Sequence, residues 1–118
     1  MARTVTIKLG NSEWHMPASY KASREIAVAV DDPLRLALQA EKGELDFTTD
    51  MVVALVYIGC KHAGCSLSKD DVGEAIFEAG LSTYLDAVGE YIAALVMGGP
   101  ERPIEGPAKK KKPRGSKS

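Results

Sequence analysis

The sequence predicts a mainly α-helical protein with a β-hairpin at its N-terminus, and three observations lead to this fold class. Residues 4–17 alternate apolar and polar side chains around a central turn segment, which is the period of strands. Residues 18–98 then carry apolar side chains at helical spacing between Pro and Gly breaks. Residues 100–118 lack any apolar period. We therefore expect one globular domain over residues 1–99, with about four to five helices, and a disordered Lys-rich tail over 100–118.

The hairpin is predicted from its alternation and its turn. Val5, Ile7 and Leu9 alternate with polar residues, a Gly-Asn-Ser-Glu turn segment follows, and Trp14 and Met16 resume the pattern. A register that pairs Leu9 with Trp14 and Ile7 with Met16 puts all of these apolar side chains on one face. Because an isolated two-stranded hairpin is marginally stable, we expect this face to pack on the helices.

Residues 18–31 fit two structures. Their Ala content and an N-cap at Ser19 favour a helix, whereas residues 26–30 alternate as a strand does. No partner strand is evident, so we predict a helix. The Asp-Asp-Pro sequence ending at Pro33 then breaks the chain, and Pro33 suits the first turn of a short helix that reaches Glu41.

Three further helices are predicted from caps and glycines. The first is preceded by a capping segment, Phe-Thr-Thr-Asp at residues 47–50, and is apolar nearly all round, so it should be central and buried. The second begins after Ser68 and ends at Gly80. The third runs from about Ser82 to Met97. Its predicted apolar stripe consists of Leu81, Leu85, Val88, Ile92, Leu95 and Val96.

The formal net charge of −1 conceals a strong asymmetry. Residues 100–118 carry seven cations and two carboxylates, a net charge of +5, which leaves −6 for residues 1–99. Such a tail can contact the phosphates of nucleic acid or another polyanion, or it can only keep the protein soluble. It has no aromatic residue on which a base could stack. The residues for a polyanion contact are Lys109, Lys110, Lys111, Lys112 and Arg114.

Targeting signals are not evident in the chain. The first residues have no apolar signal-peptide core, and the longest apolar run, residues 51–59, is far shorter than the roughly 20 residues that span a bilayer. We therefore expect a soluble cytoplasmic protein without a membrane partner. In that compartment Cys60 and Cys65 should be reduced thiols.

The sequence gives little support for catalysis or for metal binding. Cys60, His62 and Cys65 lie within six residues, but a structural zinc site needs four ligands and no further Cys exists. No nucleophile, base and orienting group stand out, and no Gly-rich loop opens a helix. We therefore predict no catalytic residue, no metal site, no cofactor and no enzymatic activity.

Binding to another protein is the function that remains, through apolar surface left over on the helices. Tyr57 lies on the most apolar helix, and Tyr84 and Tyr91 lie to one side of the stripe that contains Leu95. These four residues are the predicted partner-binding residues. Core packing is the alternative for each of them taken singly.

The order of elements carries a family resemblance. After the hairpin and helices comes Leu-Ser-Lys-Asp-Asp-Val-Gly-Glu-Ala-Ile at residues 67–76, then Ala-Gly-Leu at 79–81, then an Ala- and Leu-rich helix that ends at Gly98 and Gly99. This layout resembles the small tail assembly chaperones of tailed phages, in particular those of gene transfer agents and prophages. The resemblance covers residues 4–99 and is best over 67–99.

The resemblance implies a non-enzymatic protein that binds the long, hydrophobic tape-measure protein and keeps it soluble until tail-tube subunits assemble around it. Apolar helix faces would cover the client's helices, and the acidic exterior would keep the complex in solution. Two alternatives stay open: a nucleic-acid-associated protein that acts through its basic tail, and another tail component such as a connector. A homo-oligomer is also compatible with the sequence.

Overall fold

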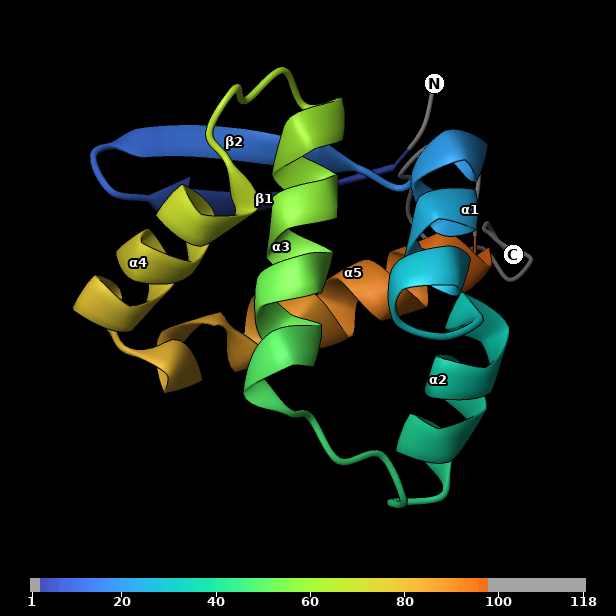
Figure 1. The fold of residues 1–118 in the computed structure, drawn as a ribbon. Helices are drawn as coiled ribbons and strands as arrows, with labels where there is room; N and C mark the ends of the chain where they lie inside the picture. The colour runs from blue at the N-terminus through green and yellow to red at the C-terminus, as the bar shows by residue number, and fades with distance from the viewer. Residues whose placement is uncertain (1–2, 98–118) are drawn as a thin grey trace, which may run out of the picture.

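A computed structural model describes residues 3–97 and has the predicted fold class, a mainly helical body behind an N-terminal antiparallel hairpin (Figure 1). The expected disordered tail lies outside the described residues. The elements are strands β1 (Thr4–Leu9) and β2 (Ser12–Pro17), helices α1 (Tyr20–Ala29), α2 (Pro33–Glu41), α3 (Thr49–His62) and α4 (Lys69–Ala79), the short 3₁₀ helix η1 (Leu81–Tyr84), and helix α5 (Leu85–Met97).

The hairpin has a tighter turn than predicted, so the predicted register is wrong by two residues. The observed partners are Val5 with Met16, Ile7 with Trp14, and Leu9 with Ser12. Gly10 has a φ of 63°, which lets the chain reverse over Gly10 and Asn11 alone. A shift of two residues preserves the face of every side chain, and the apolar face is therefore still buried.

Side-chain caps start the helices where the sequence predicts them. The Oγ of Ser19 accepts a hydrogen bond from the Ala22 amide, Thr48 caps α3 in the same way, and Ser68 caps α4. The helix predicted over residues 18–31 is confirmed as α1, and the predicted bounds of α2 are confirmed. Residues 26–30 do not form a strand: Ile26 is fully buried, and Val28, two residues on, points into solvent.

Helix α3 forms the centre of the body, as its apolar sequence predicts. It packs against β2, α1, α4 and α5, with α4 on one side of it and α1 and α2 on the other (Figure 1). Its buried residues are Val52, Ala54, Leu55, Val56, Ile58, Gly59 and Cys60. The backbone of Gly59 lies against Met16 of the hairpin, so that a Cβ on residue 59 would come within 2.5 Å of the Met16 sulfur.

The last helical segment differs from its prediction in its start and in its buried face. Residues 81–84 form η1, and α5 begins at Leu85. Leu85 and Val96 were assigned to the buried stripe, yet they are 37% and 40% exposed. The predicted burial of Val88 and Ile92 is confirmed, and Tyr84, Tyr91 and Ala94 are buried with them. Residues 84, 88, 91 and 92 have the spacing of one helix face, and that face contacts the hairpin.

Within residues 3–97, none of the helices combines the length and the apolar composition that crossing a membrane requires.

Candidate protein-binding surface

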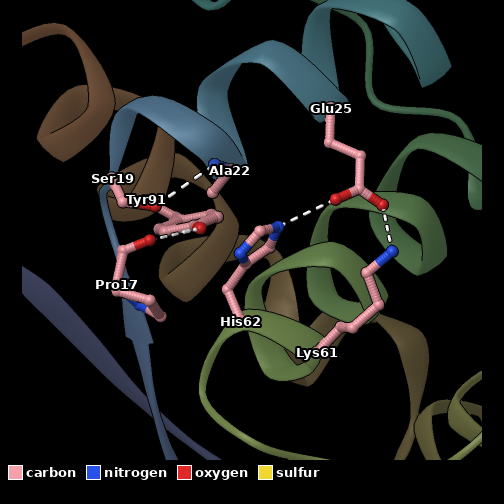
Figure 2. Close-up of polar contacts among 7 residues, drawn as sticks. All are labelled: Pro17, Ser19, Ala22, Glu25, Lys61, His62 and Tyr91. Atoms are coloured by element: carbon pink, nitrogen blue, oxygen red, sulfur yellow. Dashed lines mark hydrogen bonds and ion pairs between the residues drawn. The ribbon is translucent and has the colours of Figure 1, made fainter.

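Two of the four predicted partner-binding residues belong to the core. Tyr84 is 4% exposed and Tyr91 is fully buried. The Tyr84 hydroxyl donates a 2.7 Å hydrogen bond to the carbonyl of Lys8, and the Tyr91 hydroxyl donates one of 2.7 Å to the carbonyl of Pro17 (Figure 2). Burial raises the pKa of both phenols. The prediction that they contact another protein is therefore corrected. A buried Tyr needs a hydrogen-bond acceptor for its hydroxyl, and these two hydroxyls attach the last helical segment to the hairpin.

The other predicted contact residues are less buried. Tyr57 is half-buried on α3, where the Lys61 ammonium lies 5.5 Å from the centre of its ring. Leu95 is half-buried on α5. The residues predicted to contact a polyanion, Lys109 to Lys112 and Arg114, lie outside the described residues.

A polar cluster joins α1 to the C-terminal end of α3. The Glu25 carboxylate accepts a hydrogen bond from the Lys61 ammonium, and its other oxygen lies 2.8 Å from Nε2 of His62 (Figure 2). The hydrogen bond from Lys61, followed by that from His62, lowers the pKa of Glu25, and Glu25 raises the pKa of Lys61. Cations at the end of α3 also interact favourably with its helix dipole. We infer that these contacts hold α1 against the C-terminal end of α3.

The Cys60, His62 and Cys65 set does not converge on one point. Both cysteines are buried free thiols, whereas His62 reaches toward Glu25 (Figure 2). Burial, with a smaller contribution from Cys65, raises the pKa of Cys60 to about 12. The Cys60 thiol therefore stays protonated at neutral pH, and a protonated thiol is a poor metal ligand and nucleophile. Within residues 3–97, no three His, Cys, Asp or Glu side chains are placed to hold a metal ion together.

Two adjoining hollows flank the N-terminal half of α3. The first has a volume of about 430 Å³ and lies between the end of α1, α2 and α3. Its lining is Ala29, Val30, Leu36, Leu45, Met51 and Ala54, with Asp31, Gln39, Asp46, Asp50 and Lys69. The second, of about 560 Å³, lies between α3 and α4 and is lined by Val53, Gly73 and Phe77, with Asp50, Lys69, Asp70 and Glu74. Because the two share Asp50 and Lys69, we treat them as one surface, the α3 groove.

The α3 groove is lined by both apolar and acidic side chains. Five carboxylates and the Lys69 ammonium line it, which gives a net charge of −4. Asp50 and Asp70 lie in the first turns of α3 and α4, where a negative charge also stabilises the helix. Asp31 forms an ion pair with Arg35, at 3.4 Å. A ligand suited to this groove would combine positive charge with aliphatic surface.

Apolar side chains on α1 and α2 are exposed and were not predicted. Leu34 and Leu38 on α2 are 54% and 48% exposed, while Leu36 between them is buried. Residues two apart on a helix point to nearly opposite sides, so three leucines at 34, 36 and 38 cannot share one face. This spacing was a signal in the sequence that one or two of them would remain outside. On α1, Tyr20 and Val28 are also exposed.

Comparisons of the chain with protein-family models, with curated protein sequences and with solved structures gave no match. The arrangement of these residues is therefore the basis for the proposals that follow, together with the resemblance in the order of the elements.

Proposed function

We propose that this protein is a non-enzymatic tail assembly chaperone that acts in the cytoplasm, where it binds the tape-measure protein of a phage-like tail and keeps it soluble. The observation that carries the proposal is the exposed pair of leucines on α2. Leu34 and Leu38 lie one helical turn apart and are both about half-exposed, although α2 is anchored to the body through Leu36. An anchored helix with an outward apolar row suits the helix-in-groove mode of recognition.

The charge of the body supports the same role. Residues 1–99 carry a net charge of −6, and a strongly charged surface keeps a complex with an apolar client in solution. The layout of the hairpin and the capped helices over residues 4–99 resembles that of tail assembly chaperones, which is the reason for naming the tape-measure protein as the client.

The non-enzymatic part of the proposal draws support from the state of the reactive side chains. Cys60 is fully buried with a pKa of about 12, and the two tyrosines of the last helical segment, Tyr84 and Tyr91, donate their hydroxyls to backbone carbonyls. His62, which a catalytic thiol would need, is paired with Glu25 instead. Each of these groups has a structural role that explains its position.

Co-expression with an amphipathic helical segment of a tape-measure protein tests the proposal. The full chain should keep this segment in the soluble fraction and co-purify with it. The double variant L34S/L38S should lose most of the recovered segment, at least tenfold, because one apolar helix face is removed. The matched control L85S/V96S removes two apolar side chains of similar exposure, 37% and 40%, from α5 and should retain binding.

Thermal unfolding of both variants checks that each remains folded. If folded L34S/L38S recovers as much client as the wild type, the row on α2 is not the binding surface. If the wild-type chain fails to recover a tape-measure segment at all, the chaperone proposal is wrong.

A second candidate function is favoured by the basic run at residues 109–112. Acting through that run, the chain would bind DNA or RNA, and its affinity would fall steeply with salt. Replacing Lys109 to Lys112 by Ser separates the two candidates. The nucleic-acid function predicts that binding is lost and that the salt dependence flattens, whereas the chaperone function predicts that client recovery is unchanged.

A further inference from the structure

The α3 groove brings five carboxylates and one ammonium together along the N-terminal half of α3. It accounts for a net −4, whereas residues 1–99 as a whole carry −6. Its lining also includes apolar side chains, Val30, Leu36 and Met51 in one hollow and Val53 in the other. Carboxylates that line a hollow together with apolar side chains favour a cationic partner, which they attract electrostatically.

The chain itself contains a segment of complementary chemistry. Residues 109–114 are Lys-Lys-Lys-Lys-Pro-Arg, five cations in six residues. A Lys side chain can lay its four methylene groups along apolar surface while its ammonium reaches a carboxylate. Side chains of this kind therefore match both kinds of residue that line the groove, the aliphatic side chains and the carboxylates.

We propose that residues 109–114 bind in the α3 groove of their own chain when no partner is present. Helix α5 ends at Met97, and α5 packs against α2, which forms one wall of the groove. The twelve residues from Met97 to Lys109 can span at most about 40 Å. This reach exceeds the two shorter dimensions of the molecule, 31 and 25 Å.

Because residues 109–114 belong to the same chain as the groove, their contact with its carboxylates can persist although these charges are exposed. Surface ion pairs are individually weak, but a tethered segment has an effective concentration in the millimolar range. While it occupies the groove, the segment would keep other cationic molecules from binding to these carboxylates. This inference does not rest on the proposed chaperone function, since it concerns the isolated protein.

Amide NMR spectra of the full-length chain test it. The wild type is compared with K109S/K110S/K111S/K112S, whose changes lie outside the described residues. At an ionic strength of about 0.01 M, where the Debye length is about 30 Å, the amides of Asp46, Asp50, Lys69 and Gly73 should differ between the two proteins more than any hairpin amide. At about 1 M salt, where this length is about 3 Å, the two spectra should converge.

Lowering the negative charge of the groove should weaken its contact with the segment. D46N/E74Q changes the net charge of the groove from −4 to −2, and in this background the four Lys substitutions should shift the groove amides less than they do in the wild type. These two carboxylates lie outside the first turns of the helices, so their loss leaves the helix dipoles unaffected. The matched control E13Q/E90Q removes the same charge from the hairpin and from α5, away from the groove, and should preserve the difference.

Three results would overturn the proposal. The first is that the Lys substitutions leave the groove amides unchanged at low salt. The second is that the shifts fall on the hairpin, or that they are as large in the D46N/E74Q background as in E13Q/E90Q. The third is that the shifts grow with protein concentration, which would place the segment in the groove of a second copy.

Discussion

Helices α5 and α2 contact each other, yet they use their apolar side chains in opposite ways. Together, η1 and α5 bury two tyrosines and tie both hydroxyls to the hairpin, at Lys8 near the turn and at Pro17 at the other end. Helix α2 buries Leu36 and leaves Leu34 and Leu38 about half in solvent. The apolar content of a helix therefore does not reveal its role, whereas the direction of each side chain does.

The two helices differ in the elements that they pack against. The last helical segment crosses the hairpin, and a two-stranded hairpin needs a packed surface over its apolar face to be stable (Figure 1). Helix α2 covers the edge of the body, so only one of its faces meets other elements. This difference predicts that substitutions along the hairpin contact will unfold the protein, and that those on the exposed row of α2 will not.

The largest expected effect is that of Tyr91→Ala. The substitution removes a fully buried ring and its hydrogen bond to Pro17, and we expect a loss of about 3–5 kcal/mol in the free energy of unfolding. Leu34→Ala on the exposed row of α2 should change it by less than about 0.5 kcal/mol. Urea denaturation followed by circular dichroism measures both. Equal losses would show that the two helices do not differ as described.

The second effect is that of Gly59→Ala, where α3 meets the hairpin. A methyl group there would lie 2.5 Å from the sulfur of Met16, which is fully buried, so Met16 would have to shift within the core. We expect a loss of about 1–3 kcal/mol from overpacking, even though Ala favours a helix more than Gly does.

Gly73→Ala on α4 is the matched control. Its added methyl group would lie 3.6 Å from Val53, an ordinary contact. There the greater helix propensity of Ala should prevail, with a gain of about 0.5–1 kcal/mol. If Gly59→Ala also stabilises the protein, the packing of α3 against the hairpin is looser than described.

The smallest effect is a pH dependence from the buried thiol. The pKa of Cys60 is raised from 9.0 to about 12 in the folded protein, so the unfolded chain releases this proton first as the pH rises. The stability contributed by the protonated thiol is complete below pH 9 and is lost as the pH rises toward 12. Between about pH 8 and pH 10, the wild type should lose roughly 1 kcal/mol more than Cys60→Ala does.

Because Cys60→Ala also opens a small cavity, the comparison uses the change with pH and not the absolute stability. Urea denaturation at both pH values gives that change for each protein. Parallel pH curves for the two proteins would contradict the buried, protonated state of Cys60.

Local features of the sequence predicted the elements well. The caps at Ser19, Thr48 and Ser68 place three helix starts, because their side chains accept hydrogen bonds from backbone amides within one turn of the chain. Pro33 places the start of α2, because its fixed φ suits the first turn of a helix. The hairpin alternation predicted the correct buried face even though the register was wrong. The error arose because a four-residue and a two-residue turn differ by two positions, and both leave the same side chains inside.

The candidate site was harder to predict. Tyr84 and Tyr91 were assigned to a surface although their spacing with Val88 and Ile92 describes a single buried face. A tyrosine is compatible with both places, since its ring is apolar and its hydroxyl is polar. Whether such a tyrosine can be buried depends on whether a carbonyl can accept its hydrogen bond. Here the carbonyls of Lys8 and Pro17 do so, and they lie more than seventy residues away along the chain.

The sequence by itself determined the order and type of the elements, the central position of α3, and the opposite charges of body and tail. Only the tertiary structure decided which tyrosines are core, which leucines remain outside, and where the carboxylates of α3, α4 and the preceding loops meet. Periodicity and caps act between neighbours in the chain, so they can be read from it directly. Burial and the gathering of charge depend on contacts between distant segments, which exist only once the helices have packed.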